Sequence, residues 1–441
     1  MAGLFQSYDP HQQLLLPPSL QDWLPEDHLA YFISDTIDEL NLSSIIKKYR
    51  RVGSGNTAYH PAMMLKLLIY SYCTGVFSSR RIEQRVREDI ASRLLAAGQF
   101  PGFRSIARFR KDHINEFQEL FVQVVQVAAQ AGLVKMGQIS IDGTKVKANA
   151  SKRKAMSYGR MQEDEKRLKR EIASLTQAAI TADEIDEEEF GDHFDDQNIP
   201  DELARREKRL QAIQKAKKEL EDRKRDEAEE QRVRDEERKK QGKPSALGGK
   251  IKSETPKPKD QISFTDSESR IMKSGNGYEQ AFNAQLAIDN EAQMIVAAEV
   301  TQDPTDIRQL LPVLDAATAN VGSAPKSLLA DAGYLSEENL EGLDKRKVEG
   351  FIAIGRKNKD RDVSDASPAT QGMQRKLKTK RGAKQYAKRK HKAEAPIGWI
   401  KKCMGFRSFS MRGIQNVRGE FALVCLAMNL RRLTSRMVWE A

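Results

Sequence analysis

Hydrophobic residues in the first part of the chain recur three or four positions apart, which is the spacing of one face of a helix. Pro61 suits a first helical turn, and the apolar positions after it are Met64, Leu67, Leu68 and Tyr72. A second helix is expected from Ser79, with its apolar face at Ile82, Val86 and Ile90. A third is expected to end near Gly132, with apolar positions at Phe117, Leu120, Phe121, Val124, Val125 and Ala128. This spacing predicts an all-α N-terminal domain over residues 1–135.

A short basic helix is predicted between the last two of these, in the segment FPGFRSIARFRKDH. Its Pro-Gly pair makes a turn, and Arg104, Arg108 and Lys111 then fall on one face. Several short helices, one of them basic, are similar to a helix-turn-helix arrangement, in which the basic face contacts DNA. A plain helical bundle with a solvated basic face would give the same pattern.

From Gln138 the period of the pattern changes from that of a helix to that of a strand. The segment QISIDGTKVKANAS alternates and is rich in β-branched residues, so it predicts a strand or a bent pair of strands. Further along, FNAQLAID (282–289) and MIVAAEVTQ (294–302) predict an antiparallel hairpin, because only the turn-like NEAQ separates their cores. KSLLADAGY predicts a strand buried on both faces, and VEGFIAIG (348–355) predicts another strand.

Helical patterns lie between and after these strands. One helix has apolar positions at Ile307, Leu310, Leu311, Leu314 and Ala317. Another, SEENLEGL, has Ser336 placed to cap it. A last helical region is expected over 393–434, broken near Gly405 and Gly413. The order of elements predicts an α/β domain with a mixed sheet flanked by helices, formed by residues 136–151 and 263–441.

Residues 152–262 interrupt that domain with a segment of different composition. Acidic and basic residues are interleaved there, and its apolar positions are too sparse for a sustained heptad seam. The segment predicts a charged helical hairpin or a single helix, followed by the flexible linker GKPSALGGKIKSETPKPKD. It is expected to add little core. Pairing of two molecules, contact with DNA and no specific role are all open for it.

The net charge of the chain indicates which class of partner it binds. The net charge is +11, and a basic surface attracts polyanions, so double-stranded DNA is the expected partner. No apolar run approaches the roughly 20 residues that span a bilayer, and the first residues lack an export pattern. A cytoplasmic location without membrane association is therefore expected. Cys73, Cys403 and Cys425 are widely spaced and are expected as buried small hydrophobes rather than as disulfides or zinc ligands.

Three acids stand where a sheet would bring them together. Asp142 follows the strand QISI, Asp331 follows the strand SLLA, and Glu394 lies among basic residues. An acid after an apolar strand is costly unless it is solvated, hydrogen-bonded or bound to a cation. Three convergent carboxylates suit Mg²⁺, and two such ions can activate the attacking oxygen of a phosphodiester reaction and stabilise the leaving one. Taken singly, Asp142 and Asp331 are better explained as ordinary turn aspartates and Glu394 as a solvated helix glutamate among lysines.

A resemblance to a known family favours the chemical interpretation. The blocks SIDGTKVKANAS, LLADAGY and YAKRKHKAEAPIGWIKKCMGFRSFS resemble, in order, those of bacterial insertion-sequence DDE transposases with a Tyr-Arg-Glu-Lys signature. The stretch HPAMMLKLLIYSYCTGVFSSRRIEQ is similar to the helical N-terminal domain of the same group. The resemblance implies a ribonuclease-H-like sheet on which Asp142, Asp331 and Glu394 bind Mg²⁺, with Mn²⁺ as a substitute. It also implies that Tyr386, Arg389 and Lys401 contact DNA phosphates.

The spacing around Glu394 bears on the roles assigned to Arg389 and Lys401. Glu394 and Lys401 are two helical turns apart and can face the same way. Arg389 precedes Glu394 by five residues, where the better-known signature has four, so Lys390 or Arg407 is an alternative for the phosphate role. Pro396 suits a first helical turn, so a helix is expected to begin or to kink near Glu394, and a straight helix through 390–402 would contradict this.

The resulting hypothesis is a DNA transposase that binds the ends of its mobile element, cuts DNA with Mg²⁺ and joins the freed 3′ hydroxyl to a target. Two paired ends imply at least a dimer on DNA. The alternatives are an inactive transposase-derived DNA-binding protein and a ribonuclease-H-like DNA nuclease. A tyrosine recombinase is disfavoured because Tyr386 lacks the surrounding Arg and His set that this chemistry uses.

Overall fold

The fold is described from a computed structural model of the chain. The structure describes residues 19–49, 57–151, 154–188, 198–240, 242, 245, 253–275, 277–355 and 367–440. The first residues, on which the absence of an export pattern was predicted, lie outside this range, as do residues 243–244 and 246–252 of the predicted linker. No helix in the described part of the chain is long and apolar enough to cross a membrane.

Short helices form the N-terminal part of the described chain. They are η1 (Leu20–Trp23), α1 (Leu29–Glu39), α2 (Ser43–Ile46), α3 (Pro61–Cys73), α4 (Ser79–Glu88), α5 (Ile90–Leu95), α6 (Phe103–Asp112) and α7 (Glu116–Gln130). The helices predicted after Pro61, over the basic segment and before Gly132 are confirmed. The helix predicted from Ser79 is confirmed, with Ile82 and Val86 buried, but its extension to Ile90 was wrong, because Asp89 is extended and its side chain accepts a hydrogen bond from Ser92 N at 2.8 Å. Asp89 therefore ends α4 and caps α5.

A six-stranded mixed sheet follows. Its strands are β1 (Gln138–Lys147), β4 (Arg270–Ser274), β5 (Gly277–Asp289), β6 (Ile295–Thr301), β7 (Ser327–Ala330) and β8 (Glu349–Ile352). β5 pairs antiparallel with β1, β4 and β6, whereas β1, β7 and β8 run parallel in that order. The predicted hairpin and buried strands are confirmed, and β4 was not predicted. The mixed sheet expected from the pattern is therefore present.

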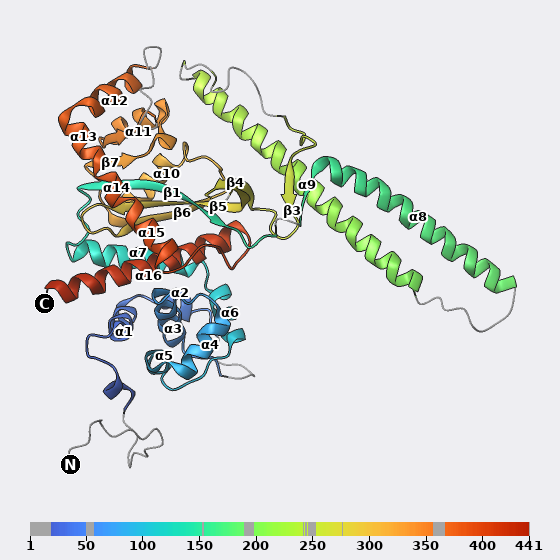
Figure 1. The fold of residues 1–441 in the computed structure, drawn as a ribbon, viewed down its shortest axis with the longest axis horizontal. Helices are drawn as coiled ribbons and strands as arrows, with labels where there is room; N and C mark the ends of the chain where they lie inside the picture. Colours follow the sequence, from blue (N-terminus) through green and yellow to red (C-terminus); the bar gives the residue numbers. More distant parts are fainter. Residues whose placement is uncertain are drawn as a thin grey trace, which may run out of the picture.

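Helices cover both faces of the sheet. α7 and α16 (Ile414–Glu440) lie side by side on the face toward the N-terminal helices, and α10 (Leu310–Val321) lies on the other face (Figure 1). α11 (Glu337–Lys345) is capped by Ser336, whose Oγ accepts from Asn339 N at 3.1 Å, as predicted. Ile307 was wrongly placed in the helix now seen as α10. It precedes the helix and is 40% exposed, because a turn closed by Gln309 N and Asp306 O comes first.

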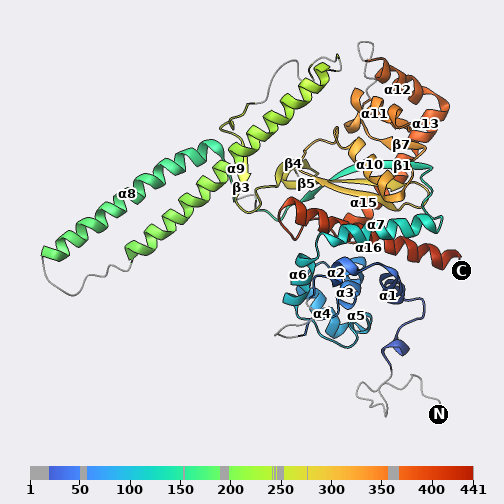
Figure 2. The same cartoon turned by 180° about the vertical axis from the view of Figure 1, so that it is seen from behind.

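The charged segment forms a helical hairpin that projects from the sheet (Figure 2). Its helices are α8 (Tyr158–Glu188) and α9 (Asn198–Lys240), and a two-stranded ribbon of β2 (Ala155–Ser157) and β3 (Gln261–Ser263) joins it to the body. The apolar contacts form a small cluster apart from the main core, made of Met161, Leu168, Ile213, Ala216, Leu220 and Ile262. Of the two predicted forms, the hairpin is present, and its small core is as expected.

The C-terminal part is more helical than predicted. It contains α12 (Pro368–Lys378), α13 (Lys380–Ala387), α14 (Arg389–Lys392), α15 (Glu394–Lys402) and α16. The expected breaks near Gly405 and Gly413 are present, since both residues have positive φ between α15 and α16. Cys73 and Cys425 are buried, but Cys403 is exposed, which contradicts the expectation for that residue. It follows the last residue of α15 and lies outside the core.

Candidate active site

Asp142 lies inside a strand, and not at its end as the sequence suggested. β1 continues to Lys147, and Asp142 stands opposite Leu286 of β5. On its other side β1 pairs with β7 only from Gln138 to Ser140. β1 and β7 therefore separate before Asp142, and its side chain is only 12% exposed.

Asp331 stands on the other side of this separation. It directly follows Ala330, the last residue of β7, and precedes a 3-10 turn over Ala332–Tyr334. Its Oδ1 accepts a hydrogen bond from Gly333 N at 2.8 Å, which fixes the turn. Its side chain is 40% exposed, so Asp331 faces solvent more than Asp142 does.

Glu394 begins a helix, as Pro396 predicted. α14 ends at Lys392 and α15 begins at Glu394, so no single straight helix runs through 390–402. Pro396 falls in the first turn of α15, where a missing backbone N–H costs nothing. The Glu394 side chain is 55% exposed.

One arginine contacts all three acids. The guanidinium of Arg389 lies 3.1 Å from Oδ1 of Asp142, 3.7 Å from Oδ2 of Asp331 and 3.9 Å from Oε1 of Glu394. The Arg389 side chain is 14% exposed, and its Nε has no hydrogen-bond partner within the described chain. Acids 189 and 63 residues apart in sequence therefore converge on a single cation.

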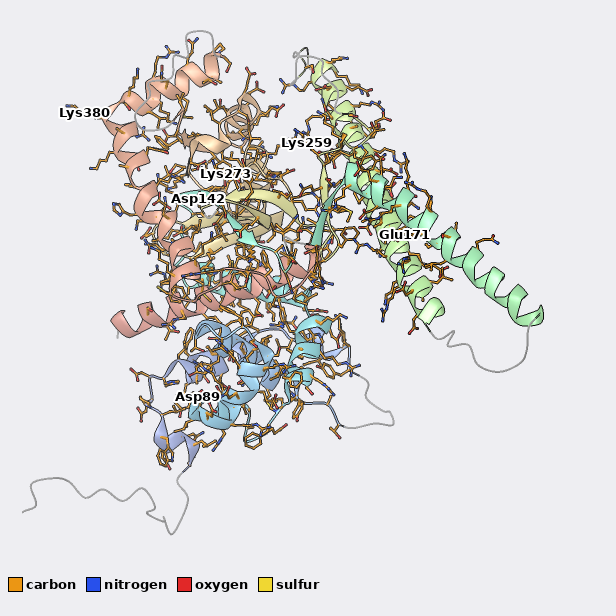
Figure 3. The ribbon with its side chains drawn as sticks, turned by 45° about the vertical axis from the view of Figure 1, so that its right-hand side comes forward. Asp89, Asp142, Glu171, Lys259, Lys273 and Lys380 are labelled. Atoms are coloured by element: carbon orange, nitrogen blue, oxygen red, sulfur yellow. The ribbon has the colours of Figure 1, made fainter. Side chains whose placement is uncertain are left out.

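Burial sets the electrostatics of this cluster. It raises the pKa of Asp142 to about 6, although Arg389 opposes the shift, and the negative charge of Asp331 adds to it. Burial alone would lower the pKa of Arg389, but the charges of Asp142, Tyr386, Asp331 and Glu394 together outweigh this effect, and the pKa is raised. Burial also raises the pKa of Tyr386, which lies next to Arg389. Figure 3 places Asp142 among the strands of the sheet, with Lys380 at the outer edge of the C-terminal helices.

The carboxylates suit a hard divalent cation in kind but are arranged around a guanidinium. Within the residues that the structure describes, no group of three His, Cys, Asp or Glu side chains is close enough to hold a metal ion. Carboxylate oxygens are nevertheless the ligands that Mg²⁺ prefers. A buried carboxylate with a raised pKa is stabilised by any added positive charge. The donor set is therefore of the kind that a divalent cation takes, and in this structure it is gathered around Arg389.

Two other predicted phosphate contacts lie nearby. Lys401 donates from Nζ to the backbone oxygen of Lys145 on β1 at 3.0 Å, and burial lowers its pKa. Arg407 is exposed and donates from Nε to the backbone oxygen of Lys401 at 3.3 Å. The side chain of Lys390 lies outside the described part of the structure. Lys401 therefore fastens α15 to β1 in this structure.

The predicted basic face of α6 is present. Arg104, Arg108 and Lys111 are all exposed, and the nearest acid to Arg108 is Asp112, at 3.9 Å. Arg110 points the other way, where its Nη1 donates to Tyr72 Oη at 3.1 Å and to a backbone oxygen at 2.8 Å. The face of α6 that carries Arg104, Arg108 and Lys111 is thus separate from the face through which Arg110 packs inward.

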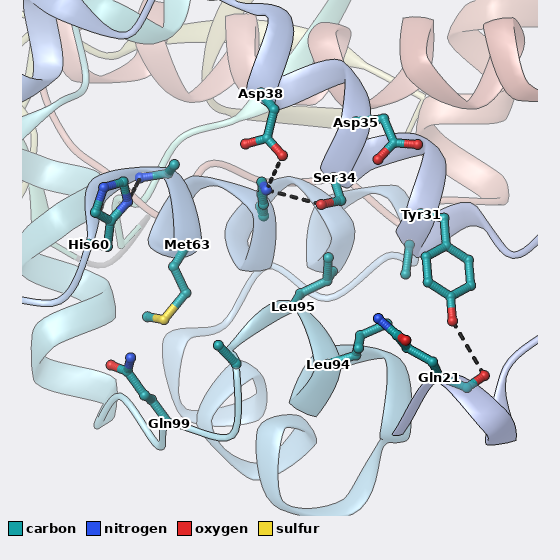
Figure 4. A pocket seen from close by; sticks show the side chains of 14 residues that line it. Gln21, Tyr31, Ser34, Asp35, Asp38, His60, Met63, Leu94, Leu95 and Gln99 are labelled. Carbon is teal, nitrogen blue, oxygen red and sulfur yellow. Dashed lines mark hydrogen bonds and ion pairs between the residues drawn. The ribbon is translucent and has the colours of Figure 1, made fainter. Parts of the chain in front are cut away.

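A cavity of about 520 Å³ lies in the N-terminal part, away from these residues. It opens between α1, α3 and α5, where Lys66 Nζ contacts Asp38 Oδ2 at 2.6 Å and Ser34 Oγ at 2.9 Å (Figure 4). None of the residues predicted to act on DNA lines it. We therefore assign it no part in the candidate site.

A buried polar network beside the acids was missed by the sequence analysis. Asn283 and Gln285 of β5 are fully buried, and Gln285 accepts a hydrogen bond from the hydroxyl of buried Tyr334. Their signal was present in the sequence: they are polar residues two apart in an otherwise apolar strand, so they share one face of the sheet. Lys145 of β1 stands opposite Asn283 in the strand pairing. Both side chains donate a hydrogen bond to the carboxylate of Asp306, so Lys145 belongs to the same network.

The geometry defines an α/β protein with a carboxylate cluster between two parallel strands of a mixed sheet. Comparison with known families gives this class a name. Residues 18–112 match the family model described as a transposase domain (DUF772), and residues 249–430 match the one described as a transposase DDE domain. Together the two matches support a DDE transposase of the insertion-sequence type. Searches of curated proteins and of solved structures found no match.

The matched ranges divide the candidate site. Asp331 and Glu394 fall within the DDE match, whereas Asp142 precedes it, on the other side of the helical hairpin. Asp142 nevertheless reaches the same guanidinium as the other two acids. The contact is made because β1 pairs with both β5 and β7 of the matched segment.

Proposed function

We propose that this protein is a DNA transposase that binds the ends of its mobile element, cuts DNA and transfers the freed 3′ end to a target. The observation that carries the proposal is the convergence of Asp142, Asp331 and Glu394 on Arg389. The strand order around β1, with antiparallel β5 and parallel β7 beside it, supports a ribonuclease-H-like sheet. The group with the Tyr-Arg-Glu-Lys signature is the finer family assignment that we propose.

Asp142, Asp331 and Glu394 would hold Mg²⁺, or Mn²⁺ in its place. Bound there, the ions would supply positive charge to the attacking and leaving oxygens of the phosphodiester. The low exposure of Asp142 keeps competing water away and strengthens electrostatic interactions. Arg389 offsets part of the negative charge of the three acids in the DNA-free protein, and its guanidinium suits bidentate contact with a phosphate once it is displaced.

DNA would lie along the basic C-terminal helices next to the acids. Tyr386 and Arg389 lie on adjacent turns there, and Lys401 follows on α15. The exposed side chains of Arg104, Arg108 and Lys111 would contact the element end through α6. Pairing of two ends requires at least two molecules on DNA, which we propose as the active assembly.

The test is cleavage of a labelled duplex that carries the element ends, in Mg²⁺ or Mn²⁺. Three proteins are compared: the unmodified chain, Asp331→Asn, and Asp344→Asn as a control on the exposed surface of α11. We expect cutting at the element boundary that depends on metal, is lowered in Asp331→Asn by about a hundred- to a thousandfold, and is unchanged in the control. DNA binding should survive in all three proteins.

Two other outcomes would replace the proposal. Binding of the ends without cutting by any of the proteins would indicate a transposase-derived DNA-binding protein. Cutting of branched DNA with no preference for the element ends and no joining would indicate a nuclease.

A further inference from the structure

Two glycines follow the two aspartates of the site, and the same carboxylate packs against both. A Cβ on Gly143 would lie 2.5 Å from Nε2 of Gln285 and 2.9 Å from Oδ1 of Asp306, both too close for a real contact. A Cβ on Gly333 would lie 3.7 Å from Oδ2 of Asp306 and 3.0 Å from Oδ1 of Asp331. Asp306 therefore packs against the backbone directly after Asp142 and against the turn that follows Asp331.

Asp306 is held in this position by three donors. Its Oδ1 accepts from Lys145 Nζ at 3.0 Å, from Asn283 Nδ2 at 2.7 Å and from Gln285 Nε2 at 2.7 Å. Hydrogen bonds to an ionised carboxylate are roughly twice as strong as neutral ones. Lys145 comes from β1 and the two amides come from β5, so the carboxylate is tied to both strands beside Asp142.

The same network reaches the turn after Asp331. Gln285 accepts the hydroxyl hydrogen of Tyr334, and Tyr334 N donates to the backbone oxygen of Asp331 at 3.3 Å. Asn283, Gln285 and Tyr334 are completely buried. Buried polar groups are costly to leave without partners, so the network resists any shift of Asp306.

We propose that Asp306 is a positioning residue that sets the separation between Asp142 and Asp331. The inference rests on the proposed function, in which these two acids hold the divalent cation. Asp306 acts through the backbone of Gly143 and Gly333, and it is not itself a ligand. Residues that orient metal ligands typically change metal affinity by about 10- to 100-fold when they are altered.

The experiment measures Mn²⁺ binding to the full-length protein without DNA, by isothermal titration calorimetry. The variants are Asp306→Ala, Asp306→Asn and the surface control Asp344→Ala. We expect Asp306→Ala to weaken Mn²⁺ binding by about tenfold or more and the control to leave it unchanged. Asp306→Asn keeps the shape and one accepting oxygen, so its loss should be smaller.

A second readout separates positioning from general structural damage. In Asp306→Ala, the Mn²⁺ concentration for half-maximal DNA cleavage should rise, while the rate at saturating Mn²⁺ should return close to that of the unmodified protein. Folding is checked by thermal unfolding. If Asp306→Ala does not fold, Asp306→Asn and Gly143→Ala provide the same measurement, because a methyl group on Gly143 would lie too close both to the Asp306 carboxylate and to the Gln285 amide that holds it.

The failures of the two proposals are distinguishable. If a folded Asp306 variant binds Mn²⁺ as tightly as the unmodified protein while Asp142→Asn does not, the positioning role is overturned and the metal site stands. If Asp142→Asn also binds Mn²⁺ normally, the proposed metal site is itself wrong. A loss of cleavage in Asp306→Ala that saturating Mn²⁺ does not restore would also overturn the positioning role.

Discussion

Two carboxylates of this molecule, each beside cations, respond in opposite ways. In the helical hairpin, Glu165 accepts from Lys169 at 2.8 Å and from Lys217 at 2.9 Å, and these hydrogen bonds lower its pKa to about 2. In the sheet, Asp142 has Arg389 at 3.1 Å, and its pKa is raised to about 6. A nearby cation therefore does not decide the ionisation of an acid by itself.

The difference lies in what surrounds each acid. Glu165 accepts hydrogen bonds from two lysines. It lies on a hairpin whose ion pairs are largely at the surface. Asp142 shares one guanidinium with Asp331 and Glu394, and the loss of hydration outweighs this partial share of charge. The ion pairs of the hairpin stabilise its own helices. In the sheet, the ionised form of Asp142 is only partly compensated, so added positive charge would stabilise it.

The largest expected effect comes from removing the shared cation. Arg389→Ala leaves buried Asp142 without its partner, which should lower the free energy of unfolding by about 3 kcal/mol at pH 8. The loss should shrink below pH 6, where Asp142 takes up a proton. Denaturant unfolding at several pH values measures this.

The matched control is Arg381→Ala, which removes a 72% exposed arginine paired with Glu349. It should cost less than about 1 kcal/mol. An equal loss in the two variants would show that Arg389 is not holding the acids.

A smaller effect of opposite sign is expected for Asp142→Asn. The folded-state pKa of Asp142 is raised above its ordinary 3.8, so the folded protein loses stability as the pH rises from about 4 through about 6. The substitution removes that loss, so the variant should be more stable by about 2 kcal/mol at pH 8 and unchanged near pH 4. Urea unfolding across this range tests the sign, and a variant that is less stable at pH 8 would contradict it.

The smallest effect is expected in the hairpin. The pKa of Glu165 is lowered, so its contribution is present above its ordinary pKa of 4.5 and is lost as the pH falls through about 2. Glu165→Gln should therefore cost less than about 1 kcal/mol at neutral pH, and less still in high salt. Thermal unfolding at low and high salt measures this against Glu207→Gln, an exposed acid of α9. A cost that salt does not change would contradict the ionic explanation.

Much of the fold followed from local patterns. The helix after Pro61, the hairpin of β5 and β6, the buried strand before Asp331 and the cap at Ser336 all have signals within a few residues. Helical spacing and strand alternation arise from backbone geometry alone, and the helix start near Glu394 followed from Pro396 in the same way. The short strand β4, the helices before Glu394 and the end of α4 at Glu88 lacked such a signal, or had a stronger competing one.

The sequence by itself determined the elements, the order of the three blocks and the residue types of the candidate site, because each depends on neighbours in the chain. Only the tertiary structure decided that Asp142 is buried inside a strand, that Arg389 lies among all three acids and that Asp306 packs on both glycines. Those contacts join residues that are distant in sequence. They depend on which strands pair and where β1 and β7 separate, and no local pattern of side chains specifies that.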